Sequence, residues 1–193
     1  EAKKLIEKYY GEIPRGGDVK DPDPMPFTLE KTKKLYHEDN FARAPQFRML
    51  WPTIEEYTDD AYALNYLGQL LSQGKKAPLY LVLEKERKLT SSYYAYNSSL
   101  EIAGSFGITV TANEGVSLKD VEQGIFDAFK KFEEDSFTEE DVERIKAGLE
   151  TGFYNSISSV LGKSFQLAAY NEYAGDPSYI RTDIEKLKAV TKD

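Results

Sequence analysis

The residues that this chain lacks exclude most self-contained catalytic centres. Its 193 residues include no cysteine, so disulfides, thiol nucleophiles and thiolate metal sites cannot form. Its single histidine, His37, is too few for a catalytic zinc site, which draws most of its protein ligands from histidine. A Ser-His-Asp triad would also have to use His37, and no serine lies in a G-x-S-x-G context.

Long apolar runs and basic surfaces are missing as well. No stretch approaches the roughly 18 apolar residues that a membrane helix needs. The chain has 33 acidic and 25 basic residues and a net charge of -8, whereas phosphate binding needs a concentrated basic surface. We therefore expect no membrane insertion and no nucleic-acid partner. The 14 tyrosines and 10 phenylalanines supply ample material for a packed core.

A stretch rich in proline and glycine divides the sequence. Residues 1–10 have one apolar helical face, and residues 14–29 have the composition of a linker, with Pro22, Pro24 and Pro26 in close succession. We expect residues 1–29 to be the last helix of a preceding domain plus a linker, and residues 30–193 to be an α+β domain. Both chain ends fall within helical patterns, so we expect a piece of a longer protein, truncated at its C-terminus.

Apolar periodicity predicts the elements of residues 30–193. Strands cluster in the first part of this region and helices in the second. This order predicts an antiparallel, ferredoxin-like sheet with helices packed on one face. In residues 105–112, large apolar residues alternate with Gly107, Thr109 and Thr111, which predicts one buried face and one small polar face. The predicted extended segments are 33–38, 46–52, 91–100 and 105–112, and helices are expected to begin near Asp59, Pro78, Ser117, Thr138 and Phe165, with a last helix through Ile184.

Two short motifs invite a binding interpretation. His37 is followed by Glu38 and Asp39, which raises the possibility of a metal or proton-transfer site. Adjacent strand residues point to opposite faces, so an exposed histidine near solvated acids fits the pattern better. Gly74-Lys75-Lys76 could bind an anion, but it does not match a phosphate-binding loop. A turn between helices with solvated lysines is the more typical reading.

Acidic and aromatic clusters have similar alternatives. The runs 133–135 (Glu-Glu-Asp) and 139–140 (Glu-Glu) could bind cations, but they are typical of a solvated loop and a helix N-terminus. Tyr93, Tyr94 and Tyr96 alternate along a strand, so at least one tyrosine faces the side opposite to the others. They could line a peptide-binding wall, although core packing is the commoner use. No nucleophile is paired with a base and an orienting group.

Several motifs, taken in order, resemble a known family. The chain is similar, over nearly its whole length, to the second domain of one half of the pitrilysin/insulinase-type zinc metallopeptidases, also called inverzincins. The first motif is similar to the helix that closes that family's zinc-carrying domain, and the others to successive elements of the second domain. The motifs are KKLIEKYYGEIP (3–14), APQFRMLWPT (44–53), LGQLLSQG (67–74) followed by PLY (78–80), GSFGI (104–108) and FTEEDV (137–142).

The resemblance also implies which residues are missing. Such proteins bind zinc through an H-x-x-E-H helix and a distal Glu, and this chain contains no H-x-x-E-H. The family uses an Arg and a Tyr seven residues later to stabilise the tetrahedral intermediate. Those positions are Glu84 and Ser91 here, a carboxylate that repels an oxyanion and a side chain too short to reach one. Both are therefore predicted to be non-functional, and Arg87 is out of register by three residues.

The resemblance implies a non-catalytic domain of a zinc metalloendopeptidase. It would help to form a chamber for unfolded peptides and pack on the zinc-bearing domain and second half of the same protein or of a homologous subunit. We expect no cofactor or metal in this chain, and zinc in the parent protein, which the habits of bacterial members place in the periplasm or outside the cell. One alternative is a structural or peptide-binding subunit from a catalytically dead relative. Another is an unrelated ferredoxin-like binding module.

Overall fold

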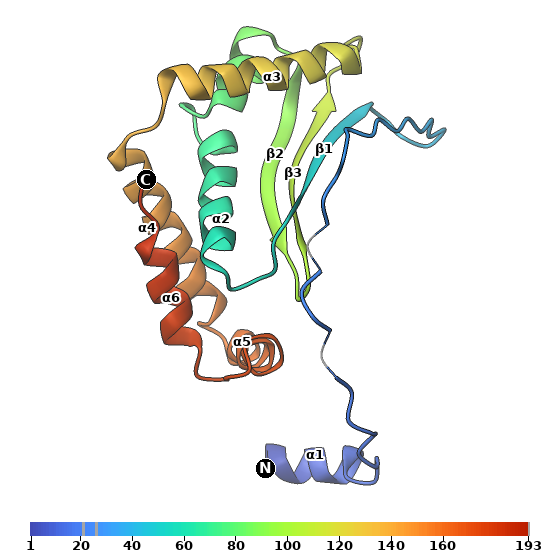
Figure 1. Ribbon diagram of the computed structural model, residues 1–193, viewed down its shortest axis with the longest axis vertical. Coiled ribbons are helices and arrows are strands. Elements are labelled where there is room, and N and C mark those ends of the chain that lie inside the picture. Colours follow the sequence, from blue (N-terminus) through green and yellow to red (C-terminus); the bar gives the residue numbers. More distant parts are fainter. Residues whose placement is uncertain (21, 26, 193) are drawn as a thin grey trace.

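The computed structural model describes residues 1–20, 22–25 and 27–192. Asp21 and Pro26 of the predicted linker, and Asp193 at the end of the predicted domain, lie outside the described residues. A three-stranded antiparallel sheet in the order β1-β3-β2 forms the centre of the fold (Figure 1). Its strands are β1 (Gln46–Thr53), β2 (Thr90–Ser99) and β3 (Gly104–Ala112). The predicted α+β class is confirmed.

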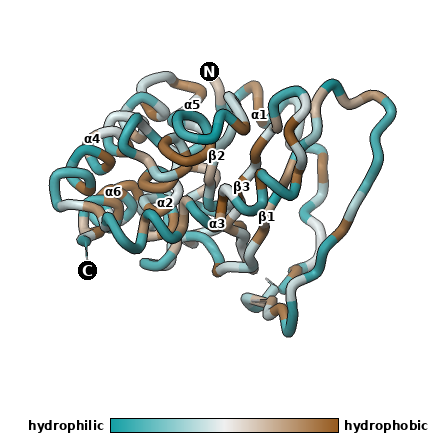
Figure 2. Tube along the Cα trace, turned by 90° about the horizontal axis from the view of Figure 1, so that it is seen from above, coloured by the Kyte–Doolittle hydropathy of each residue, from teal (hydrophilic) through white to brown (hydrophobic). Residues whose placement is uncertain are grey.

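One side of the sheet carries the core. Phe47 pairs with Val110, Met49 with Ile108 and Trp51 with Phe106, so the apolar residues of β1 and β3 share one side because side chains alternate along a strand. Ile108 and Val110 are fully buried. Figure 2 shows α2, α4 and α6 together on one side of the sheet, as predicted.

Three helices close this core. α2 (Asp59–Ser72) lies against β2, and Gly68 permits the approach, because a Cβ there would stand 3.2 Å from the Ala95 carbonyl oxygen. The helix predicted from Pro78 continues as η1 (Tyr80–Glu86), a π-helix. α3 (Leu118–Asp135) packs on η1 with its apolar face. Their shared core is made of fully buried side chains: Leu79, Leu83, Val121, Ile125 and Ala128.

Three further helices form a second layer: α4 (Glu139–Ser156), α5 (Val160–Tyr173) and α6 (Ile180–Ala189). A carboxylate on α6 links them to α2. Asp183 accepts hydrogen bonds from the hydroxyls of Tyr62 (2.6 Å) and Tyr170 (2.5 Å). The Tyr66 hydroxyl donates to the Leu187 carbonyl at 2.7 Å. These bonds satisfy buried polar atoms and tie α5 and α6 to α2.

The N-terminal helix stands apart from this body. α1 (Ala2–Tyr10) has no buried residue, and an irregular segment separates it from the rest (Figure 1). Along that segment the Met25 amide donates to the Ile102 carbonyl at 2.7 Å, which brings the chain to the tip of the β2–β3 hairpin. The predicted division between residues 1–29 and 30–193 stays a prediction.

The strand predicted at residues 33–38 was wrong. These residues have no regular secondary structure, and Leu35 and Tyr36 are 96% and 82% exposed. Its two large apolar residues are adjacent and do not alternate with polar ones, and among the described residues the segment pairs with no strand. A surface ion pair between Lys34 and Glu122 of α3 (2.6 Å) is its link to the body.

The polar face predicted for β3 is less open than the alternation suggests. Thr109 is only 2% exposed, and the ring of Tyr96 covers Gly107. Because β3 is the central strand, side chains of β1 and β2 flank it on both sides. The open side of the sheet therefore belongs mainly to its two outer strands.

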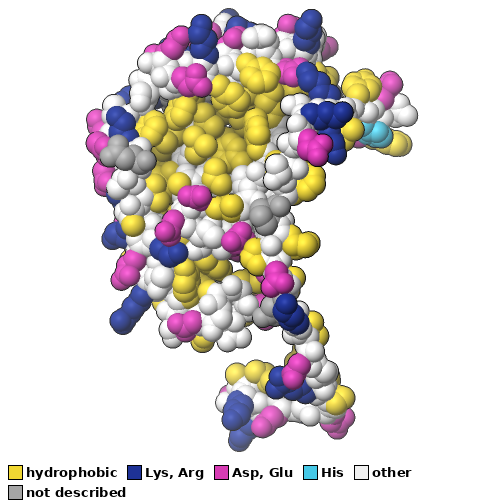
Figure 3. Space-filling view, in the orientation of Figure 1, with side chains coloured by type: hydrophobic (Ala, Val, Ile, Leu, Met, Phe, Trp, Pro, Cys, Tyr) yellow, Lys and Arg dark blue, Asp and Glu magenta, His cyan; other side chains and the backbone are white. Residues whose placement is uncertain are grey.

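Apolar side chains also remain exposed on the helix side. Figure 3 shows them gathered between α2, the sheet and α3, with charged residues around the edge. Trp51 of β1 and Phe126 of α3 are both exposed, and the rings of both lie against that of Phe129 of α3. This surface is available for a further packing contact.

Candidate functional site

Glu84 and Ser91 lie on either side of the turn between η1 and β2. Glu84 is partly buried on η1, and Ser91 is exposed at the irregularity between Thr90 and Ser92. Burial first and the nearby Glu84 carboxylate second raise the pKa of Tyr93 to about 12. No cation pairs with Glu84 within the described part of the chain. This position therefore offers a carboxylate and a phenol, and no positive charge that would stabilise an oxyanion.

Arg87 does not replace the missing arginine. Its guanidinium donates to the carboxylate of Asp127 on α3. Because this pair lies between η1 and α3, it holds the Arg87 side chain against the helix layer. Arg87 therefore supports packing. The non-functional roles assigned to Glu84 and Ser91 stay predictions.

His37 and the acidic runs do not assemble into a metal site. His37 is exposed on the irregular segment, where it lines a broad groove with Glu38, Asp39 and the start of α3. The run 133–135 ends α3, where Lys131 pairs with Asp135 at 3.0 Å. Glu139 and Glu140 occupy the first turn of α4. In residues 1–20, 22–25 and 27–192, no three His, Asp or Glu side chains are grouped to hold a metal ion.

Two of the three clustered tyrosines lie on the open side of the sheet. Tyr94 pairs with Thr109 and Tyr96 with Gly107, opposite to the core side, whereas Tyr93 pairs with Val110 on the core side. The rings of Tyr94 and Tyr96 are 5.5 Å apart between centroids. Tyr94 is 47% exposed and Leu50, on β1, is 54% exposed. Core packing thus describes Tyr93, but it was the wrong interpretation for Tyr94.

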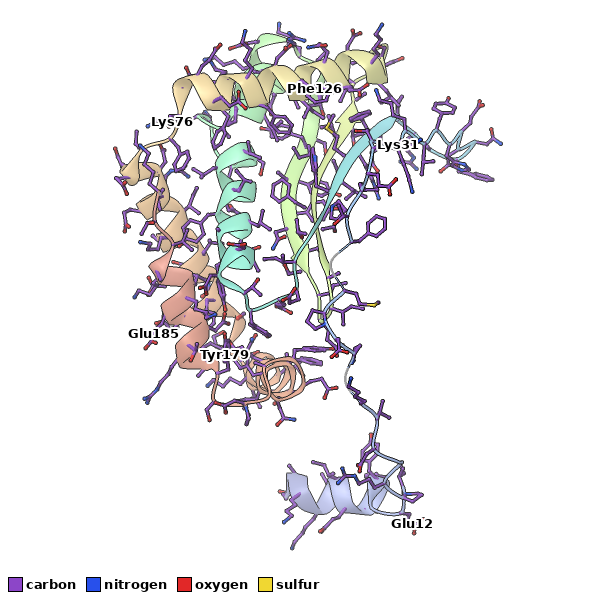
Figure 4. The ribbon with its side chains drawn as sticks, viewed as in Figure 1. Glu12, Lys31, Lys76, Phe126, Tyr179 and Glu185 are labelled. Atoms are coloured by element: carbon purple, nitrogen blue, oxygen red, sulfur yellow. The ribbon has the colours of Figure 1, made fainter. Side chains whose placement is uncertain are left out.

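The turn at Gly74 has a neighbour that the sequence did not reveal. Gly74 has φ +88°, a left-handed conformation that favours glycine. Arg144 of α4 lies beside it, with its Nη1 atom 3.9 Å from the position of a Cβ on Gly74. Lys75, Lys76 and Arg144 line a cavity of about 260 Å³. Figure 4 shows Lys76 between the end of α3 and the start of α4.

Comparison with known proteins identifies the family. Residues 1–149 match the family model described as the peptidase M16 inactive domain. The chain belongs to this family. No curated protein matches it. This M16 inactive domain also shares its fold with many solved structures.

Three of these structures illustrate the likeness. A protease from Helicobacter pylori is 15% identical with a TM-score of 0.74, over 98% of this chain and 46% of that one. A candidate zinc protease from Bordetella pertussis is 15% identical with a TM-score of 0.67, over 78% and 83% of the two chains. The periplasmic protease PqqL from Escherichia coli is 12% identical with a TM-score of 0.66, over 98% and 21%. At these identities the likeness shows the fold alone.

This chain spans about half of the Helicobacter protease, 46% of its length. Each helix within the described ranges is too short or too polar to cross a bilayer.

Proposed function

We propose that this chain is the non-catalytic domain of a zinc metalloendopeptidase. In this role it forms part of the wall of the peptide-binding chamber and packs on the zinc-bearing domain of the same protein or of a homologous subunit. The observation that carries the proposal is the open side of the sheet. It combines Tyr94, Tyr96 and Leu50 with Arg48, which pairs in register with Thr109.

The chemistry of this open side suits an unfolded peptide. Tyrosine rings offer apolar area at a low cost in conformational entropy, and their hydroxyls bond to peptide groups of any sequence. Arg48 is exposed and adds donors for peptide carbonyls. A surface of this kind binds extended chains without requiring a motif.

The N-terminal helix supports the packing role. Leu5, Ile6, Tyr9 and Tyr10 are exposed on α1, where they form one apolar face. We propose that this face belongs against the zinc-bearing domain, whose H-x-x-E-H helix holds the metal outside this chain. A location in the periplasm or outside the cell fits the periplasmic relative PqqL.

The missing catalytic pair also fits a second arrangement. With Glu84 and Ser91 at the positions of the family's Arg and Tyr, this domain contributes binding and no transition-state stabilisation. A subunit of a catalytically dead relative would use it in the same way. Whether the longer protein carries H-x-x-E-H and cleaves peptides distinguishes the two arrangements.

Peptide binding tests the proposal. Fluorescence anisotropy with a labelled unstructured peptide measures the affinity of the 193-residue chain, and Tyr94→Ser/Tyr96→Ser should weaken it about tenfold, since each aromatic contact contributes about 0.5–1.5 kcal/mol. Tyr154→Ser, which removes an exposed tyrosine of α4 in the helix layer, is the matched control and should change nothing. No binding, or an equal loss in both variants, would refute the role of the open side.

A further inference from the structure

Three cations meet at the cavity beside Gly74. Lys75 and Lys76 come from the turn after α2, and Arg144 comes from the second turn of α4. The cavity is about 260 Å³ and is also lined by Gln73, Glu140 and Asp141. The protein as a whole has a net charge of -8, so this grouping runs against its overall charge.

The donors of these cations are largely unused. Among the described residues, Lys75 and Lys76 form no ion pair or hydrogen bond, and Arg144 approaches Asp141 at 3.6 Å, longer than a hydrogen bond. Arginine carries five N–H donors in a planar fork. Three side chains that line the same cavity therefore have hydrogen-bond donors available for a ligand.

The two acidic residues that line the cavity differ in their effect. The Asp141 carboxylate accepts hydrogen bonds from the backbone amide and hydroxyl of Thr138 in a capping box. Those bonds, together with Lys76 and Arg144, hold its pKa below the usual value. Asp141 is thus committed to the helix end. Glu140 is exposed and opposes an incoming anion.

We propose that the cavity formed by Lys75, Lys76 and Arg144 binds a carboxylate of a peptide, either an acidic side chain or a C-terminus. This inference rests on the proposed peptide-binding function and adds to it a second contact, on the helix side of the sheet, that prefers acidic segments. Arginine recognises a carboxylate through its fork, and the two lysines add point charges. The left-handed turn at Gly74 and the capping box of α4 hold the two sides of the cavity in place.

A pair of labelled unstructured peptides tests the preference. One carries a short run of aspartates and the other has asparagine at the same positions. At low salt the 193-residue chain should bind the aspartate peptide about tenfold more tightly, and the difference should shrink as salt screens the charges. In Lys76→Gln/Arg144→Gln the two peptides should bind equally. In Lys163→Gln/Arg181→Gln, a matched pair of exposed cations away from the cavity, the preference should persist.

Two further measurements separate the proposed site from misfolding and from general anion binding. Glu140→Gln removes the opposing charge and should tighten binding of the aspartate peptide several-fold, a gain that a misfolded variant would not give. Inorganic phosphate at millimolar concentration should compete weakly. Equal binding of both peptides, or loss of the preference in both double variants, overturns this inference while leaving peptide binding itself intact. Competition by phosphate as effective as the peptide overturns the carboxylate assignment. Failure of both peptides to bind refutes the proposed function as well.

Discussion

At the scale of single residues, glycines mark the places where backbones touch. Gly104 begins β3 within the motif GSFGI, and a Cβ there would lie 2.3 Å from the Ile54 carbonyl oxygen and 3.0 Å from Ser99 Cα. Both contacts are to backbone, which cannot rotate away. Glycine is therefore required at position 104 because the backbone packs too closely there for a side chain.

Gly104→Ala should lower the free energy of unfolding by about 1–3 kcal/mol, because the added methyl group overpacks a fixed backbone contact. Urea unfolding followed by circular dichroism measures the change. Gly148→Ala is the control: Gly148 lies inside α4 with open space around the added carbon, so this change should raise stability by about 0.5–1 kcal/mol. A stability loss of similar size in both variants would contradict the explanation.

The surroundings of Glu84 and Arg87 were only partly predictable from the sequence. From the sequence, Glu84 was predicted to stand where the family has the arginine that stabilises an oxyanion. In the structure its neighbour is the phenol of Tyr93, and among the described residues no cation pairs with it. The engagement of Arg87 with Asp127 could not be foreseen, because α3 lies far along the sequence and its packing angle is set by the tertiary fold. The three-residue offset in the sequence excluded Arg87 as the family's catalytic arginine, but it did not reveal that Arg87 pairs with Asp127.

At the scale of elements, α4 depends on its first turn. Thr138 and Asp141 form a reciprocal capping box, in which the Thr138 hydroxyl accepts from the Asp141 amide at 3.2 Å. Thr138→Ala should cost about 1 kcal/mol of stability, since it leaves a helix amide unsatisfied. Thermal unfolding measures the loss, and Thr138→Ser should restore most of the stability because it keeps the oxygen. Equal losses in the two variants would show that the cap contributes little.

Most elements followed from their sequence patterns. Two-residue alternation located β1 and β3, and 3–4-residue spacing located the apolar faces of α3 and α4, because each of these elements buries one side within the chain. The pattern failed at residues 33–38. There Leu35 and Tyr36 are neighbours in the sequence with no two-residue alternation around them, and among the described residues the segment has no partner strand.

Contacts between distant elements were beyond the sequence. Asp183 on α6 joins Tyr62 on α2 and Tyr170 on α5, and Arg144 joins the lysines after α2. No local spacing connects these residues, because their proximity depends on how the helices pack. The Gly74 turn could be recognised as a possible anion site, but its third cation required the structure.

At the scale of the whole molecule, buried tyrosines should make the folded state less stable at alkaline pH. Burial first and the carboxylates of Glu143 and Glu150 next raise the pKa of Tyr66 to about 12. Burial first and Glu84 second raise the pKa of Tyr93 to about 12. Burial and the Asp183 carboxylate raise the pKa values of Tyr62 and Tyr170 as well. The folded state therefore holds these phenol protons more tightly than the unfolded state, in which tyrosine has a pKa of about 10.

This difference predicts a loss of stability at high pH. The contribution is fully present below about pH 10, the unfolded value, and is lost as pH rises toward the folded values near 12. Urea midpoints measured between about pH 8 and 11 should fall with pH. Tyr66→Phe should be less stable at pH 8, because it loses the bond to Leu187, but its midpoint should fall less steeply. Parallel curves for the two proteins would contradict this origin.

In our proposal this M16 domain takes part in peptide binding and has no metal centre of its own. Isothermal titration calorimetry of the 193-residue chain with zinc is the decisive measurement. Because the chain has one histidine and no cysteine, and its described acids form no ligand cluster, we expect only weak heats without a defined stoichiometry. Tight binding of one zinc ion per chain would refute the proposal.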